Sequence, residues 1–310
     1  MSSQPNFRNY VPANAFENVT ISGIASCDIH LTRGKPQRNK PIIDDQCKKR
    51  PPKRMPSDLP PAGTMKLSLS IGNMIGDGAA GGVYEATIQY DHSSPELRDM
   101  AMPPLVVKIS RRRKPTRLAR EAFYYEEMEY LQGCVIPRYY GLFDAMIPSG
   151  CDFKPWSEDA QNHQHCCHQL SSDSNDSLSD FPPKRKAKKA HAPPSPLSIL
   201  ILERVGERLS MAQTRSQALR DELEEMYKHL AILGLDHCDI RYQNILRAPN
   251  TADSLPSLPS LFSERTYAWR IIDFDLCRKS NVGFGRLSFQ FHQLLGRLLF
   301  NLPHSYLSEE

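Results

Sequence analysis

The stretch His237–Leu246 reads HCDIRYQNIL and places an aspartate and an asparagine, Asp239 and Asn244, in one short polar segment. An aspartate there could orient or accept the proton of an attacking hydroxyl, and an asparagine oxygen could bind magnesium, so the spacing suits phosphoryl transfer. Arg241, between the two, would neutralise charge on the transferring group. A polar loop with satisfied hydrogen bonds explains the same residues. The choice between these interpretations depends on the motifs on either side.

A glycine-rich segment, GDGAAGGVY, follows a run at 66–71 in which apolar and polar residues alternate as in a half-buried strand. Gly76, Gly78 and Gly81 would let backbone N–H groups approach the phosphates of a nucleotide. Val83 would cover its base. The glycines lead into a second strand-like run, whereas a dinucleotide-binding fingerprint leads into a helix. A glycine hairpin without a ligand is the alternative.

The β-branched run PLVVKIS predicts a further strand that carries one lysine, Lys108. After a glycine loop, such a lysine is placed to bind nucleotide phosphates, although lysines also lie on the wet face of ordinary strands. Apolar residues at three- and four-residue intervals predict a helix over 117–133. Glu121 on this helix is the expected partner of Lys108. Glu126 and Glu127 would take its place in another helical register.

The second half of the chain begins with an apolar run at 198–202 that is typical of a buried strand. The segment after it would cross between two lobes, and backbone groups of Glu203 and Val205 would meet an adenine there. A clear helical pattern over 219–233 then leads to the HCDIRYQNIL stretch.

A strand-like run, WRIIDF, ends in Asp273, and a helical pattern covers 287–299. Asp273 is placed to bind magnesium on nucleotide phosphates, because hard cations prefer carboxylate oxygens. An aspartate at the end of a strand can also serve only as a helix cap.

Composition predicts two segments that do not join the core. The chain has 310 residues, 40% of them hydrophobic, and 25 prolines. Residues 1–64 are rich in Pro, Asn, Ser, Lys and Arg and poor in aromatic residues, which predicts a disordered basic arm. Residues 149–197 combine an acidic serine-rich part with a basic part and predict a disordered insertion.

Charge and cysteine usage predict an intracellular protein, cytoplasmic or nuclear. A net charge of +4 is mild and does not predict nucleic-acid binding. The basic run Lys184–Lys189 has the composition of a nuclear localisation signal, which an import receptor would bind, or is a solvated charged segment. The eight cysteines lack the spacing of a disulfide framework, and no apolar run is long enough to span a bilayer. The cluster HQHCCH at 163–168 lacks the spacing of a zinc site.

With these motifs in this order, the sequence resembles the protein-kinase-like fold over 66–300, and ILERVG and IIDFD are similar to the divergent kinase-domain proteins of fungi. The resemblance implies an α+β, bilobal fold with a β-rich N-lobe and a shortened, mostly helical C-lobe. The implied domains are an arm at 1–64, an N-lobe at 65–148, the insertion at 149–197, and the last N-lobe strand, hinge and minimal C-lobe at 198–310. The implied cofactors are ATP and Mg²⁺. The implied roles are ATP binding by Gly76, Gly78, Gly81 and Lys108, support of Lys108 by Glu121, catalysis by Asp239, and magnesium binding by Asn244 and Asp273.

Three features depart from that family. Cys238 replaces the arginine of the usual HRD, and Asp275 replaces the glycine of DFG, so that DFD also resembles aminoglycoside and choline phosphotransferases. No APE segment follows Asp273. We expect an ATP- and magnesium-dependent phosphotransferase that acts on Ser/Thr hydroxyls of a protein. Small-molecule phosphorylation, a pseudokinase that only binds partners, and a truncated gene product with exposed apolar surface stay open as alternatives.

Overall fold

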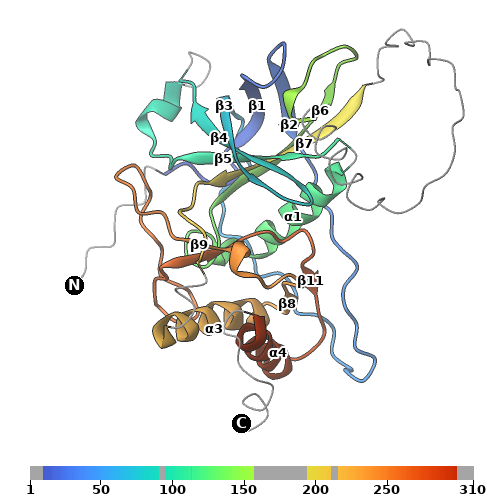
Figure 1. Cartoon of the computed structure of the whole chain (residues 1–310), viewed down its shortest axis with the longest axis vertical. Coiled ribbons are helices and arrows are strands. Elements are labelled where there is room, and N and C mark those ends of the chain that lie inside the picture. Colours follow the sequence, from blue (N-terminus) through green and yellow to red (C-terminus); the bar gives the residue numbers. More distant parts are fainter. Residues whose placement is uncertain (1–9, 91–94, 113, 157–193, 211–215, 299–310) are drawn as a thin grey trace, which may run out of the picture.

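A closed β-barrel dominates the upper part of the molecule in the computed structural model (Figure 1). The structure describes residues 10–90, 95–112, 114–156, 194–210 and 216–298. Seven strands form the barrel in the order β1-β2-β6-β7-β5-β4-β3. Their bounds are Phe16–Ser22 (β1), Ile29–Arg33 (β2), Met65–Asp77 (β3), Gly81–Ile88 (β4), Leu105–Ser110 (β5), Tyr139–Ile147 (β6) and Ser195–Glu203 (β7).

Alternation of side chains fills the barrel. Strand β1 buries Phe16, Val19 and Ile21, and the opposite residues of the strand stay partly in solvent. Strand β5 is buried along its whole length, as expected for a central strand with both faces covered. One hydrophobic core therefore lies inside the barrel, and a second lies between its outer face and the helices.

Strand β1 closes the barrel, because it pairs in antiparallel fashion with β2 and in parallel with β3. The prediction that residues 1–64 form a disordered arm is therefore wrong for the described residues from 10 onward. The composition of this segment is polar, but β1 and β2 together bury five apolar residues in the barrel. They are Phe16, Val19, Ile21, Ile29 and Leu31.

Most of the other described residues lie below the barrel and form three α-helices, short strands and irregular loops (Figure 1). Helix α1 packs against β5, β6 and β7, and α3 packs against α4. Strands β8 and β11 form one antiparallel pair, and β9 and β10 form another. The α-helices are Pro115–Glu127 (α1), Gln217–Ile232 (α3) and Phe284–Leu298 (α4), and the short strands are Leu235–Asp236 (β8), Ile245–Arg247 (β9), Trp269–Ile271 (β10) and Arg278–Lys279 (β11). Short 3₁₀ turns cover Pro95–Asp99 (η2), Glu129–Leu131 (η3) and Tyr242–Asn244 (η5).

These findings overturn the predicted fold class. We expected a bilobal, protein-kinase-like fold with a mostly helical C-lobe, but the strands close into a barrel and most of the described elements are strands. Below the barrel, α3 and α4 share the described part of the chain with four short strands. The prediction failed because the sequence patterns did not indicate β1 and β2, the two strands that close the barrel. The predicted bilobal, kinase-like fold is therefore wrong.

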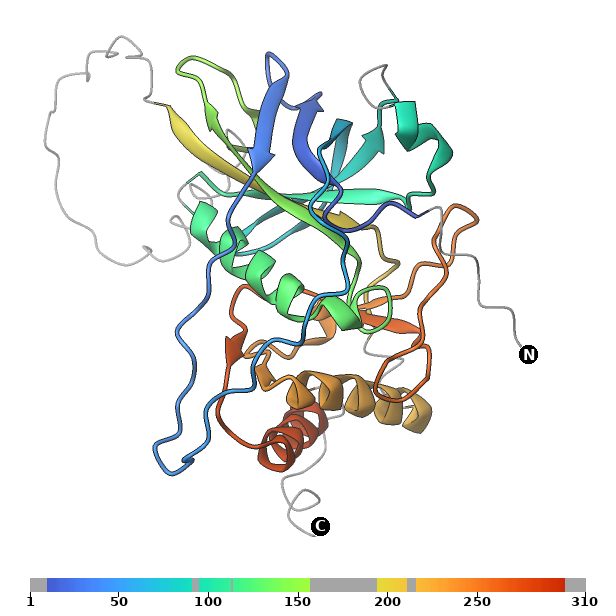
Figure 2. The same ribbon diagram turned by 180° about the vertical axis from the view of Figure 1, so that it is seen from behind.

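Residues 34–64, here called the strap, connect β2 to β3 by a long excursion along the outside of the molecule. Figure 2 shows the strap running from the barrel past α1 toward α4 and back. It has no strand or helix, but its backbone is bonded to other elements. The N–H of Gln37 donates to the carbonyl of Ala119 at 2.8 Å, and the N–H of Ile42 donates to the carbonyl of Lys279 at 2.7 Å. The strap therefore belongs to the folded structure.

Local periodicity predicted several elements correctly. The runs at 66–71 and 198–202 lie in strands, and the helical pattern at 219–233 matches α3 to within two residues at each end. The helix predicted over 117–133 is shorter, because α1 ends at Glu127 and a 3₁₀ turn follows it. Most of the predicted insertion, including Lys184–Lys189 and the HQHCCH cluster, lies outside the described residues. Among the helices that are described, none is both long and apolar enough to cross a membrane.

Candidate functional site

A cleft of about 940 Å³ lies between the barrel and the part of the chain below it. Strands β3, β4, β5 and β7 and helix α1 contribute to one side, and β9 and the segment after β10 contribute to the other. Charged residues from both sides, Lys108, Glu121 and Asp273, line it together. The apolar residues that line it include Ile75, Val83, Val106, Leu202, Leu246 and Ile272.

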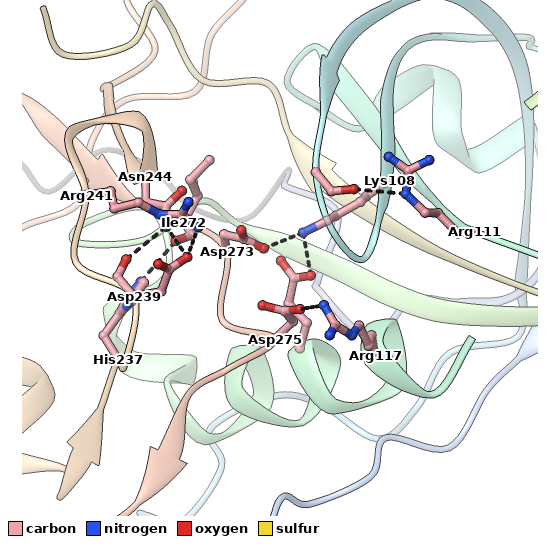
Figure 3. A network of polar contacts seen from close by, with 12 residues as sticks. Lys108, Arg111, Arg117, His237, Asp239, Arg241, Asn244, Ile272, Asp273 and Asp275 are labelled. Carbon is pink, nitrogen blue, oxygen red and sulfur yellow. Dashed lines mark hydrogen bonds and ion pairs between the residues drawn. The ribbon is translucent and has the colours of Figure 1, made fainter. Parts of the chain in front are cut away.

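Lys108 is the centre of the charged part of this cleft. It lies on β5, is 6% exposed, and donates at 2.7 Å to Glu121 Oε2. It also donates at 2.7 Å to Asp273 Oδ1 (Figure 3). These contacts use two of the three N–H donors of its ammonium. The structure thus brings together the predicted strand lysine, helix glutamate and strand-end aspartate.

The sequence allowed three glutamates of α1 as partners of Lys108, and in the structure each has a different partner. Glu121 pairs with Lys108, whereas Glu127 forms an ion pair with Lys279 at 2.7 Å. Glu126 lies 3.8 Å from Arg54 of the strap. The register of the helix therefore selects Glu121, as predicted.

Asp273 has a strained backbone. Its φ is +68°, in the left-handed region that residues other than glycine rarely adopt. Cys238 has a φ of +59°, also left-handed, and its N–H donates to Asp236 Oδ1 at 3.2 Å. Strain of this kind costs about 1–3 kcal/mol per residue and concentrates at functional sites.

Buried His237 ties the HCDIRYQNIL segment to the residue before Asp273. Its Nε2 donates to the carbonyl of Ile272 at 3.0 Å, and the N–H of Ile272 donates to the carbonyl of Asn244 at 3.0 Å. Burial lowers the pKa of His237, so the ring is neutral near pH 7. The two segments that carry Asp239 and Asp273 are therefore held in one register.

Asp239 accepts hydrogen bonds within its own segment. Asn244 Nδ2 donates to its carbonyl at 2.9 Å and to its Oδ2 at 3.0 Å, and Arg241 pairs with the same Oδ2 (Figure 3). Among the described residues, Asp239 Oδ1 and Asn244 Oδ1 have no protein partner. Arg241 is thus bound to the predicted base.

The glycine segment is a hairpin between β3 and β4. Gly76 and Val83 line the cleft, but Gly78 and Gly81 are absent from its lining. The N–H of Gly78 donates to the carbonyl of Gly81 at 3.1 Å. A Cβ on Gly81 would lie 2.0 Å from the carbonyl oxygen of Ile109, so this glycine is required by the close approach of β4 to β5.

Glu203 and Val205 both line the cleft, where β7 leaves the barrel. The side chain of Glu203 is fully occupied, because its carboxylate pairs with the guanidinium of Arg138 at 2.5 Å and accepts the Arg138 N–H at 3.1 Å. The backbone N–H of Glu203 also donates to the carbonyl of Arg138 at 2.9 Å, so neither the side chain nor this N–H is available to a ligand. The contact of Glu203 with an adenine stays a prediction.

The charges around Lys108 shift one another's pKa. Burial raises the pKa of Glu121 to about 7, although the charge of Lys108 counteracts it. Burial opposes the charged forms of Lys108 and Asp273 too, but the attraction between them outweighs it, so the pKa of Lys108 is raised and that of Asp273 is lowered. Burial and the neighbouring Asp273 raise the pKa of Asp275. Two carboxylates thus compete for one ammonium, and a further cation would relieve the excess negative charge.

Sequence reasoning missed Arg117 and Tyr125, which lie one helical turn before and after Glu121. Arg117 pairs with buried Asp275 at 3.2 Å, and Tyr125 lines the cleft and packs edge-on against Phe274. The signal was their spacing of four residues from Glu121, which places all three on one face of α1.

The part of the chain that the structure describes contains no group of three His, Cys, Asp or Glu side chains arranged to hold a metal ion. The predicted set, Asp273 with Asn244, is smaller than such a group. Neither a scan against protein-family models nor a search of the curated proteins gives a match for this chain. The functional argument therefore depends on the geometry of the cleft.

Proposed function

We propose that the cleft binds ATP with magnesium and that the chain transfers the terminal phosphoryl group to a hydroxyl, either of Ser/Thr or of a small molecule. One observation carries this proposal. Lys108 is buried beside the cleft with two carboxylates, and no third acceptor among the described residues occupies its ammonium. The proposal rests on these side chains and is independent of the fold class, which the sequence patterns predicted wrongly.

Lys108 is suited to bind a phosphate oxygen as a point charge in a water-poor setting. Glu121 and Asp273 hold its ammonium at the cleft. Its raised pKa keeps it positively charged at neutral pH. The apolar lining, including Val83 and Val106, is suited to a nucleotide base.

Asp273 and Asn244 would hold the magnesium ion. Mg²⁺ takes one or two protein carboxylates together with phosphate oxygens and water, so it needs no group of three acidic residues. Asn244 commits its Nδ2 to Asp239, which leaves its Oδ1 for a cation. Asp273 likewise has Oδ1 on Lys108 and a second oxygen in reserve. When bound, the ion neutralises negative charge on the phosphates.

Asp239 would act on the acceptor. Its Oδ1 takes the proton of the acceptor hydroxyl as the oxygen of that hydroxyl bonds to the terminal phosphorus and the bond from that phosphorus to ADP breaks. Asn244 and Arg241 fix the carboxylate through Oδ2 and leave Oδ1 open. His237 keeps this segment in register with Asp273 through Ile272.

A module that binds a nucleotide without transferring phosphate is the second candidate. The pairing of Arg241 with Asp239 favours it, because the base is already engaged by a cation and the arginine is not available to the phosphoryl group. The two candidates agree on binding and differ only in transfer.

The first experiment measures the thermal unfolding midpoint with and without Mg²⁺–ATP. A ligand at about 100 times its Kd adds about 2.7 kcal/mol to stability, which gives a clear shift. We expect the shift in wild type and in Lys279→Met, whose lysine is also buried and paired with a glutamate of α1 but lies away from the cleft. We expect its loss in Lys108→Met. Absence of any shift in folded wild-type protein would overturn the proposal.

The second experiment follows radiolabelled terminal phosphate from ATP into protein, added serine-containing peptide, small-molecule hydroxyls or water. Asp239→Asn should keep the unfolding shift and lose transfer by at least ~100-fold. Asp144→Asn is the matched control, since Asp144 lies on β6 and accepts the Ser198 hydroxyl at 2.6 Å, away from the cleft. If Mg²⁺–ATP shifted the unfolding midpoint of the wild type but no acceptor received phosphate, the nucleotide-binding module would be the remaining candidate.

A further inference from the structure

Two cysteines far apart in sequence lie side by side at the barrel. Cys27 follows β1 in the connection to β2, and Cys151 follows β6. Their sulfur atoms are 3.7 Å apart, in a partly exposed position. Figure 1 shows that the β1–β2 connection and the end of β6 lie at the same end of the barrel.

The backbone around them forms a short antiparallel ladder. Ala25 and Phe153 form a bridge. The N–H of Ser26 donates to the carbonyl of Asp152 at 3.1 Å, which makes that pair a hydrogen-bonded one.

The register of this ladder makes the two cysteines direct partners. Pairing alternates along an antiparallel ladder, so continuing this register places Cys27 opposite Cys151, as a pair without backbone hydrogen bonds between its two residues. Opposite Cα atoms at such positions are about 4.5 Å apart, and their side chains are closest there. That spacing falls within the range of about 4.4–6.8 Å that a disulfide requires.

We propose that Cys27 and Cys151 form a site of reversible oxidation, at which a low-molecular-weight disulfide converts the two thiols to a cross-strand disulfide. One deprotonated sulfur attacks the external disulfide, forms a mixed disulfide and releases one thiol. The second sulfur then displaces the other thiol. Two protein thiols lose two electrons and two protons, and the external disulfide takes them up as two thiols.

The surroundings assign the attacking sulfur. The hydroxyl of Ser26 donates a hydrogen bond to the sulfur of Cys151 at 3.7 Å, so this sulfur has a polar partner besides Cys27. The contact with Cys151 raises the pKa of Cys27, which therefore stays a thiol for longer as the pH rises. Cys151 is thus the first nucleophile, and the rate should increase from neutral toward alkaline pH.

The bond would close a large part of the chain into one loop. Residues 27–151 include β2 to β6 and α1, with Lys108 and Glu121 among them. Cross-linking two points so far apart restricts the unfolded chain strongly. The oxidised protein should therefore unfold at a higher temperature, whether or not the cleft binds a nucleotide.

The test treats the full chain with oxidised glutathione at about pH 8.5, maps disulfides by mass spectrometry of unreduced peptides, and records the unfolding midpoint. We expect a Cys27–Cys151 peptide and a midpoint raised by about 5 °C or more, reversed by dithiothreitol. Cys27→Ser and Cys151→Ser should each lose both effects. Cys47→Ser is the matched control, since Cys47 belongs to the strap and donates to the Asn281 carbonyl. Glutathione adducts without the internal bond, or pairing with other cysteines, would overturn the proposal.

Discussion

Helix α1 supplies the glutamates of two buried lysine–glutamate pairs, and the surroundings of the two pairs differ. Lys108 lies 2.7 Å from Glu121, and Lys279 lies 2.7 Å from Glu127. In both pairs each side chain is less than 10% exposed. The pairs therefore share chemistry, helix and burial, and the difference between them lies in what else each ammonium contacts.

Lys279 is enclosed by oxygens of the fold. Besides the ion pair with Glu127, which lacks the alignment of a hydrogen bond, it donates to the carbonyls of Pro52 at 3.1 Å and Leu233 at 3.0 Å. Lys108 contacts two carboxylates instead and lines the cleft. A lysine held by carbonyls of the strap and of the residue after α3 stabilises the structure. A lysine shared by two carboxylates at a cleft can exchange one of them for a ligand.

The largest effect that sharpens this comparison is on stability. Lys279→Met leaves Glu127 buried without its cation and two carbonyls without their donor, so we expect a loss of about 3–5 kcal/mol in the free energy of unfolding. Lys108→Met should cost less at pH 7, because Glu121 has a pKa of about 7 and can take a proton instead. Urea denaturation of both variants at pH 7 measures the difference. Equal losses would mean that both lysines are structural to the same degree.

The next prediction concerns pH. Burial raises the pKa of Glu121 from 4.5 to about 7, so between these values the folded state binds a proton that the unfolded state has released. Stability must then fall as the pH rises from about 4.5 to about 7, by a total of about 3 kcal/mol from this residue. In Glu121→Gln this fall should be absent, and the variant should gain stability relative to wild type across the window.

Wild type and Glu121→Gln must be compared at each pH, because the titration of His237 changes stability in the opposite direction over a neighbouring pH range. Its pKa is lowered by burial, so its contribution increases stability as the pH rises toward 6.5. Urea denaturation at intervals from pH 4 to 8 gives the difference curve, in which His237 cancels. A flat curve would mean that folding leaves the pKa of Glu121 near 4.5.

Part of this site could be predicted from local patterns. The predicted helix carried Glu121 as the expected partner of Lys108, and the position of Lys108 in a strand after the glycine loop indicated a phosphate-binding lysine. That both side chains are buried was not predicted. Asp273 was expected at the end of a strand, where the structure has it directly after Ile272. Such residues sit in short segments whose own periodicity fixes which way they face.

The barrel and the strap could not be predicted in this way, because both depend on partners that are distant in sequence. The polar composition of the N-terminal segment indicated disorder, yet β1 pairs in parallel with β3 across the whole length of the strap. The strap itself is held by backbone groups and by polar side chains such as Asn281, whose Nδ2 donates to the carbonyls of Asp44 and Cys47 at 3.0 Å each. Composition measures apolar burial and says nothing of such bonds.

The smallest expected effect tests how the strap is held. Arg54 of the strap pairs with Glu129 at 3.1 Å and lies 3.8 Å from Glu126, but its side chain is 36% exposed. Exposed pairs contribute about 0.2–1 kcal/mol and are screened by salt. Glu129 also keeps the hydroxyl of Ser57 at 2.6 Å and the N–H of Asp58 at 2.9 Å when Arg54 is removed.

Arg54→Ala should therefore lower the free energy of unfolding by less than about 1 kcal/mol, and the difference from wild type should disappear in about 1 M salt. Urea denaturation at low and high salt measures both quantities. Lys279→Met serves as the reference, since its ammonium contacts the strap at Pro52 from a buried position. If Arg54→Ala cost as much as Lys279→Met, the strap would be fastened by its surface charges. We expect the larger loss in Lys279→Met, which would mean that the strap is held by the buried lysine and by the backbone hydrogen bonds around it. The bonds of this lysine to backbone carbonyls are also what distinguishes the Lys279–Glu127 pair from the Lys108–Glu121 pair.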